Sequence, residues 1–171
     1  MDNTNYFPGK HKNTSINIAL VDQLTLLTDA LRNVLCQMQE VNAVVSYTDG
    51  KEFMADHAMF LPDILIMDWA INGMTGLELL NSARSAVSKD LKIIIISSVT
   101  DVQTIKHAIR RGANSFLPKS ASLEELKEAI THVMLYAPRD DREVDVALQL
   151  VHASYLFALG SRAEVPTTTP A

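Results

Sequence analysis

The sequence predicts a doubly wound α/β fold, in which a parallel sheet lies between two layers of helices. Short β-branched runs alternate with longer apolar segments of helical period, which is typical of successive strand-helix units. Two of the runs, 64–67 and 93–96, are apolar at every position rather than alternating. Continuous apolar runs are expected where a strand is covered by helices on both faces, so these two strands should be central.

Five strands and five helices follow from this pattern, and we expect the flavodoxin-like strand order. Helix-boundary residues support the assignment. Thr100 or Asp101 can cap the fourth helix, Gly112 can end it, and Ser122 with Glu125 forms a capping box for the fifth. The expected strands are 16–21, 43–47, 63–67, 92–96 and 115–117, and the expected helices are 26–38, 51–59, 77–86, 102–111 and 123–135.

We expect four segments along the 171 residues. Residues 1–15 are polar and form a flexible leader, 16–135 form the α/β domain, 136–160 form an additional helical segment, and 161–171 form a disordered tail. The helix expected within the third segment is apolar almost all the way round. It should therefore pack either on the domain or on a second copy of the chain in a homodimer.

Composition excludes several classes of function. The formal net charge is -5 and the segment after residue 135 is also acidic, so direct nucleic-acid binding is not expected. No window resembles a signal peptide or is long and apolar enough for a membrane span, which favours a cytoplasmic location. Cys36, the only cysteine, falls in an apolar helical pattern and is expected to be buried.

Polar residues follow the apolar runs at the positions where ligands gather in a parallel sheet, the carboxyl ends of the strands. Asp22 and Gln23 follow the first run, Asp68 the third, Ser97 and Ser98 the fourth, and Lys119 the last. Two carboxylates can hold a hard divalent cation, and a lysine ammonium can meet an anionic oxygen. These residue types together indicate a site for a divalent cation and an anionic group.

Four blocks in this order resemble the receiver domain of two-component response regulators, and the resemblance extends from residue 16 to about residue 135. The closest likeness is to the LuxR/NarL/FixJ-like subgroup, whose output is a helix-turn-helix domain. Residues 136–171 are too few to hold such an output domain. The blocks are IALVDQLTLL (18–27), PDILIMDWAINGMTGLELL (62–80), KIIIISSVTD (92–101) and GANSFLPKSASLEELKEAI (112–130).

The resemblance implies a role for each residue of the constellation. It implies that Asp68 accepts a phosphoryl group from a histidine kinase or phosphotransfer protein, with Mg²⁺ as the cofactor. Asp22, Asp68 and the backbone carbonyl of Ala70 would bind the metal. Ser97 and Lys119 would contact the phosphoryl oxygens, and Phe116 would be the aromatic partner of Ser97 in a conformational switch.

The chain departs from the family pattern at Gln23, where a second acid is usual. A neutral amide lowers the negative charge of the site, so Mg²⁺ should bind weakly, with Gln23 itself a doubtful ligand. Ala70 and Val99 occupy positions that in this family tune autodephosphorylation. Because neither side chain can hydrogen-bond an attacking water, a phosphorylated state should be long-lived.

The leading hypothesis is a single-domain response regulator, which is not an enzyme and signals by altered protein contact. The contact could be a homodimer through the C-terminal helix or through the face of the fourth and fifth helices. Two alternatives stay open. One is a pseudo-receiver, an interaction module not controlled by phosphorylation because of Gln23; the other is the receiver half of a truncated DNA-binding transcription regulator.

Overall fold

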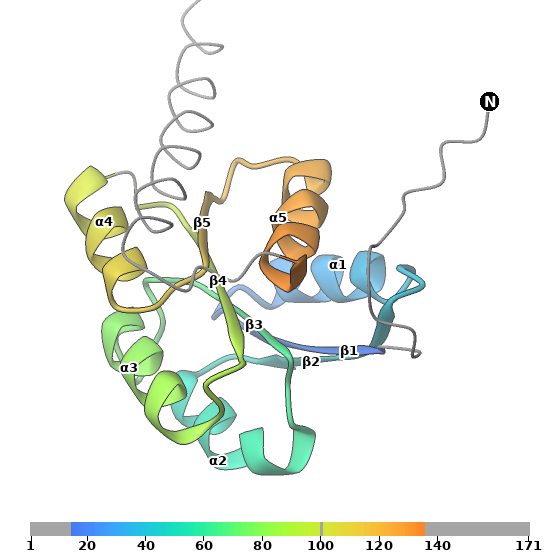
Figure 1. Cartoon of the computed structure of the whole chain (residues 1–171), viewed down its shortest axis with the longest axis horizontal. Coiled ribbons are helices and arrows are strands. Elements are labelled where there is room, and N and C mark those ends of the chain that lie inside the picture. Colours follow the sequence, from blue (N-terminus) through green and yellow to red (C-terminus); the bar gives the residue numbers. More distant parts are fainter. Residues whose placement is uncertain (1–14, 100, 136–171) are drawn as a thin grey trace, which may run out of the picture.

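The computed structural model describes residues 15–99 and 101–135, which form one parallel sheet with helices on both faces (Figure 1). The described elements alternate strictly between strand and helix. The strands are β1 (Ile16–Val21), β2 (Val41–Tyr47), β3 (Ile64–Met67), β4 (Lys92–Ser97) and β5 (Ser115–Pro118). The helices are α1 (Thr25–Leu35), α2 (Gly50–Phe60), α3 (Gly76–Ala86), α4 (Val102–Arg110) and α5 (Leu123–Leu135).

The strand order is β2-β1-β3-β4-β5, and every neighbouring pair is parallel. This is the flavodoxin-like order that the sequence predicts, and the fold class is confirmed. β3 lies at the centre, between β1 and β4. The carboxyl ends of β1, β3, β4 and β5 therefore lie next to one another along one edge of the sheet.

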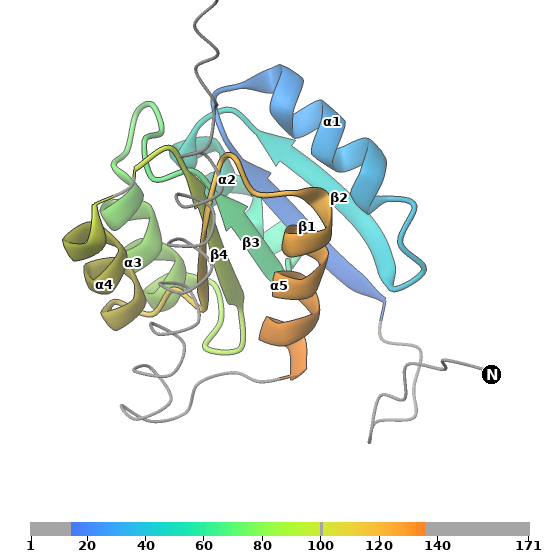
Figure 2. The same cartoon turned by 90° about the horizontal axis from the view of Figure 1, so that it is seen from above.

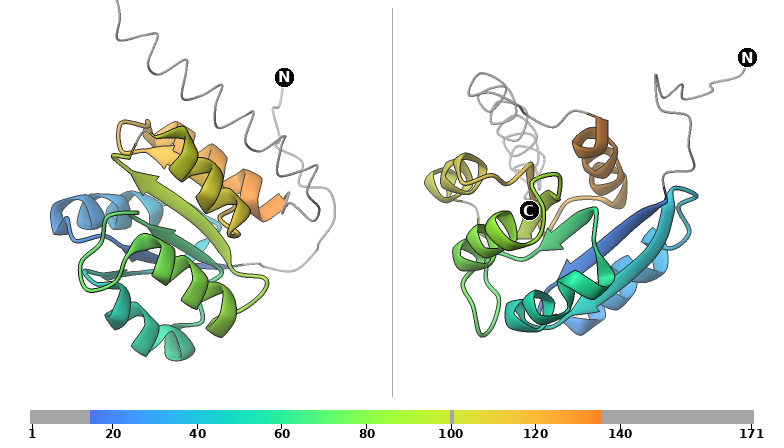
Figure 3. Two further views of the ribbon diagram at one scale, coloured as in Figure 1. Left: turned by 90° about the vertical axis from the view of Figure 1, so that its left-hand side faces the viewer. Right: turned by 60° about the horizontal axis from the view of Figure 1, so that its bottom comes forward.

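Two separate apolar cores hold the layers together. Leu65 and Met67 of β3 face the core that includes side chains from α2, α3 and α4. Ile64 and Ile66 of the same strand face the core formed with α1 and α5, and these two helices lie in front of the sheet in Figure 2. Figure 3 shows both layers from two further sides. All four β3 side chains are buried, and each contributes roughly 1.5–3 kcal/mol.

The predicted helix caps are present where the structure describes them. Asp101 accepts the Thr104 amide at 2.8 Å, whereas Thr100, the other candidate, lies outside the described residues. Ser122 and Glu125 form the reciprocal capping box, and Gly112 follows α4 with a φ of 104°, a left-handed conformation that favours glycine. The expected leader up to residue 14, the segment 136–160 and the tail 161–171 also lie outside the described residues.

The prediction that Cys36 is buried is wrong, because its thiol-bearing side chain is exposed. The expected helix 26–38 ends at Leu35, and Cys36 is the C-cap residue, whose amide donates to the Arg32 carbonyl at 2.9 Å. Leu35 fills the core position instead and is fully buried. The apolar pattern continued past the helix end, so it did not show where the backbone turns away from the core.

Arg84 ties the end of α3 to the start of β4 and to the α4–β5 turn. Its guanidinium donates to the backbone carbonyls of Leu91 and Gly112 and, at 2.7 Å, to the Asn114 Oδ1 atom. The same Asn114 oxygen accepts the Ile93 amide at 2.8 Å. Burial lowers the pKa of Arg84. The end of α3, the start of β4 and the α4–β5 turn are thus joined through one side chain.

Replacing Arg84 by methionine should keep most of the side-chain volume but leave these buried carbonyls without their donors. We expect the free energy of unfolding to fall by about 3 kcal/mol, from roughly 1–3 kcal/mol for each unpaired group with partial relaxation. Arg32→Met is the matched control, since Arg32 is an exposed helical arginine with one surface ion pair to Asp29, and its loss should cost under about 1 kcal/mol. Urea denaturation measures both variants. An equal loss of unfolding free energy in the two would show that the hydrogen bonds of Arg84 do not stabilise the fold.

Candidate functional site

The backbone ladder of the sheet fixes the positions of the predicted site residues. The Asp68 amide donates to the Val21 carbonyl at 2.9 Å, which aligns the end of β3 with the end of β1, just before Asp22. The Lys119 amide donates to the Ser97 carbonyl at 2.9 Å and aligns β5 with β4 in the same way. All four residues are therefore held at one edge of the sheet by main-chain hydrogen bonds.

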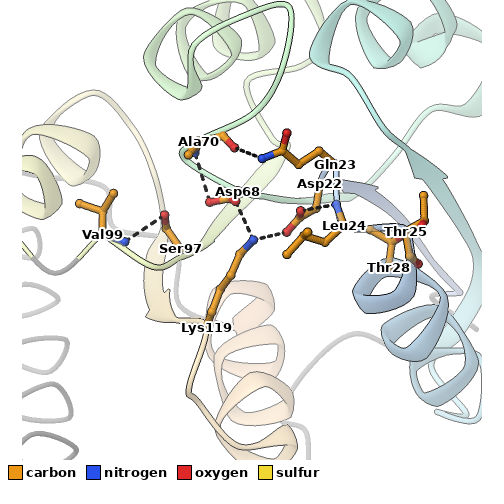
Figure 4. A network of polar contacts seen from close by, with 10 residues as sticks. All are labelled: Asp22, Gln23, Leu24, Thr25, Thr28, Asp68, Ala70, Ser97, Val99 and Lys119. Atoms are coloured by element: carbon orange, nitrogen blue, oxygen red, sulfur yellow. Dashed lines mark hydrogen bonds and ion pairs between the residues drawn. The ribbon is translucent and has the colours of Figure 1, made fainter.

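Lys119 lies between the two carboxylates (Figure 4). Its Nζ atom is 2.7 Å from Asp22 Oδ2 and 2.6 Å from Asp68 Oδ2. Asp22 and Asp68 are only 7% and 5% exposed, and the Lys119 side chain is 17% exposed. Burial would lower the pKa of Lys119, but the hydrogen bonds and charges of both aspartates outweigh it and raise the pKa above its usual value. The ammonium therefore stays protonated at neutral pH.

The second oxygen of each carboxylate accepts a backbone amide. Asp22 Oδ1 accepts the Leu24 amide at 2.8 Å, and Asp68 Oδ1 accepts the Ala70 amide at 3.2 Å. Each carboxylate is therefore fixed by one charged and one neutral donor. Both side chains are oriented before any ligand binds.

Gln23 connects the loop after β1 to the loop after β3. Its side chain is exposed, and its Nε2 atom donates to the Ala70 carbonyl at 3.4 Å (Figure 4). That carbonyl is the backbone group expected to bind a metal. Residue 23, expected to be at most a doubtful ligand, is thus a hydrogen-bond donor to an expected ligand.

Ser97 is fully buried at the end of β4, while Ser98 is exposed. The Ser97 hydroxyl accepts the Val99 amide at 3.3 Å, a long hydrogen bond. Phe116 is 1% exposed and belongs to the core shared with α4, against which Val99 also packs. The hydroxyl and the aromatic side chain of the expected switch therefore both adjoin the α4 side of the sheet.

The loop after Asp68 is held by residues that the sequence analysis did not select. The Gly76 amide donates to the Trp69 carbonyl at 3.1 Å, and a Cβ at Gly76 would lie 2.5 Å from that oxygen. Gly73 has a φ of 74°, and a Cβ there would lie 2.7 Å from Asp49 Oδ2. The spacing of Thr75 and Glu78, which form a capping box, was a sequence signal for this loop's end.

Comparison with known proteins assigns the family. Residues 18–131 match the family described as response regulator receiver domain, and the chain belongs to this family. It is 31% identical over 127 residues to the transcriptional regulatory protein DesR of Bacillus subtilis, covering 72% of this chain and 62% of DesR. It is 26% identical over 129 residues to LiaR of the same organism, covering 75% of this chain and 61% of LiaR.

A solved structure supports the same fold. The signal receiver domain of NarL from Mycobacterium tuberculosis aligns with a TM-score of 0.63 and 23% identity, covering 68% of this chain and 94% of that domain. The chain spans about half to three fifths of the length of the first curated relatives it matches. Receiver domains generally act as phosphoacceptors rather than enzymes, interact with histidine kinases and phosphotransfer proteins, and bind Mg²⁺ at the phosphorylation site.

As arranged, the described residues do not present a free set of ligands for a divalent cation. They contain no group of three or more His, Cys, Asp or Glu side chains that could hold a metal ion. The two available carboxylates, Asp22 and Asp68, both direct an oxygen at the ammonium of Lys119. Mg²⁺ requires near-octahedral oxygen ligands, so it would have to displace that ammonium or bind beside it.

No helix among the described residues has the length and apolar character of a membrane span.

Substituting Gly76 by alanine should displace the Trp69 carbonyl and with it the loop that begins at Asp68. Gly50→Ala is a matched control, because Gly50 is also the first residue of a helix, but its added Cβ meets side-chain rather than backbone atoms, the nearest being the end of the Ile71 side chain at 3.1 Å. We expect Gly76→Ala to lower the free energy of unfolding by about 2 kcal/mol more than Gly50→Ala. It should also shift the emission of Trp69, the only tryptophan. Unchanged emission and stability would show that the contact is readily relieved.

Proposed function

We propose that this chain is a response regulator that accepts a phosphoryl group on Asp68 from a histidine kinase or phosphotransfer protein. The observation that carries the proposal is the contact of the buried Asp68 carboxylate with the Lys119 ammonium at 2.6 Å. An ammonium held there can offset negative charge on a phosphoryl group that reaches the carboxylate. Its location at the carboxyl end of the central strand agrees with where ligands bind in such sheets.

In the proposed reaction, a carboxylate oxygen of Asp68 attacks the phosphorus atom of a phosphohistidine. A phosphorus–oxygen bond forms, and the phosphorus–nitrogen bond of the donor breaks with its electron pair remaining on the imidazole. Lys119 pairs with the phosphoryl oxygens, and Asp22 keeps Lys119 protonated and in place. This electrostatic contribution is the principal one that a protein makes to phosphoryl transfer.

The proposed output is a change in protein contact on the face around α4 and α5. A phosphoryl group would offer the Ser97 hydroxyl a stronger acceptor than its present partner, since charge-assisted hydrogen bonds are stronger than neutral ones. Among the described residues, the partner of the Ser97 hydroxyl is the Val99 amide, at 3.3 Å. Movement of Ser97 would open space for Phe116 and shift the equilibrium between two arrangements of this face, including a homodimer contact.

A second candidate is the receiver half of a transcription regulator. DesR and LiaR are transcriptional regulatory proteins, and the chain spans only 62% and 61% of their lengths. Sequencing the transcript beyond the codon of Ala171 distinguishes the two candidates. A helix-turn-helix coding region in the same frame would support the second.

Phosphorylation at Asp68 should be visible by intact-mass spectrometry after incubation with acetyl phosphate. We expect the wild-type chain to gain one phosphoryl group that hydroxylamine removes, because an acyl phosphate is reactive towards nucleophiles. Asp68→Asn should gain none. Asp90→Asn, in an exposed turn, should be labelled like the wild type. Equal labelling of Asp68→Asn and wild type would refute the assignment.

The phosphorylated state should persist because Ala70 and Val99 present no group that can position a water molecule. We expect its half-life to be far longer than seconds. Ala70→Glu, which supplies a base at an exposed position two residues from Asp68, should shorten the half-life by at least about tenfold. Ala86→Glu, at the far end of α3, serves as the charge-matched control. A wild-type half-life of seconds would disprove this expectation.

A further inference from the structure

The Asp22 and Asp68 carboxylate oxygens and the Ala70 carbonyl, which are the expected metal ligands, each already accept one hydrogen from the protein. Lys119 binds one oxygen of Asp22 and one of Asp68, and backbone amides bind the other two carboxylate oxygens. The Ala70 carbonyl accepts the Gln23 amide. A cation would therefore have to compete with a donor from the protein at each of these expected ligands.

The charges of the site point the same way. Asp22, Asp68 and Lys119 together carry one net negative charge, and Gln23 adds none. An acid at position 23 would raise this to two negative charges, which one divalent cation balances. With Gln23, a divalent cation would leave an excess positive charge beside the Lys119 ammonium, and repulsion at close range in a partly buried site is costly.

The contact of Gln23 with Ala70 shows what the amide does in place of an acid. A carboxylate and a backbone carbonyl are both acceptors, so they can approach only with a cation or a proton donor between them. The carboxamide supplies its own N–H and reaches the carbonyl directly, at 3.4 Å. The loops after β1 and β3 are thereby connected without a metal.

We propose that Gln23 and Lys119 together take the place of a divalent cation, so that this site neither requires nor tightly binds Mg²⁺. Gln23 is a positioning residue that holds the Ala70 carbonyl, and Lys119 supplies the positive charge between the two aspartates. The part of this inference that concerns phosphoryl transfer without metal rests on the proposed function. The part that concerns metal binding does not.

Metal binding is tested directly by titrating the full chain with Mg²⁺, using isothermal titration calorimetry and the fluorescence of Trp69 beside Asp68. We expect wild type to bind at least about tenfold more weakly than Gln23→Asp, which gains a carboxylate ligand. Gln37→Asp, in the exposed turn after α1, makes the same charge change away from the site and should behave like wild type. Affinities of wild type and Gln23→Asp within about threefold would overturn the inference.

Labelling by acetyl phosphate in Mg²⁺ and in EDTA tests the second part. Wild type should be labelled at rates within about twofold in the two conditions, whereas EDTA should slow Gln23→Asp at least about tenfold. Wild-type labelling only with Mg²⁺ would overturn this inference while leaving Asp68 as the phosphoacceptor. Labelling in neither condition, with the titration as expected, would overturn the proposed function and leave the metal-binding conclusion in place.

Discussion

The ion pair of Lys119 with Asp22 and Asp68 is the interaction on which the rest of the site depends. Two carboxylates close together and largely buried repel each other by about 4 kcal/mol at 4 Å separation in a medium of intermediate polarity. One ammonium at 2.7 and 2.6 Å converts that repulsion into two attractions. An aspartate can therefore follow each of the adjacent strands β1 and β3, and removing the lysine would leave the negative charges uncompensated.

The sequence predicts much of this arrangement because the residues that matter directly follow apolar runs. Asp22, Asp68 and Lys119 come immediately after the first, third and last strands, and the parallel order fixed by chain topology brings those strand ends together. The spacing of the apolar residues therefore predicts both the fold and the approximate location of the site. The continuous apolar run of β4 does not by itself choose between Ser97 and Ser98, and the structure shows that Ser97 is buried and Ser98 exposed.

Two kinds of feature are not predicted by the sequence. One is contact between side chains that are far apart in the chain, and the other is the position at which the backbone leaves a helix. Arg84 meets Gly112 and Asn114, which lie 28 and 30 residues away, and no local pattern marks that meeting. Cys36 has an apolar neighbourhood in sequence but follows the end of α1. The donor role of Gln23 is also hidden, because the family pattern presents it as a missing ligand and only the structure gives its partner.

The substitution of a hydrogen bond for a charge at Gln23 alters how the proposed phosphorylated state would be stabilised. A phosphoryl group brings about -1.5 to -2 charges while esterification removes one from Asp68, so the site becomes more negative. If no cation neutralises that charge, the hydrogen-bond donors that stabilise it must come from the protein itself. Lys119 is already placed, and Ser97, at the end of the strand next to β3, has a buried hydroxyl whose hydrogen bond from the Val99 amide is long. Phosphoryl charge at Asp68 would then act directly on β4 and the loop leading to α4, which is the side of the sheet where Phe116 is packed.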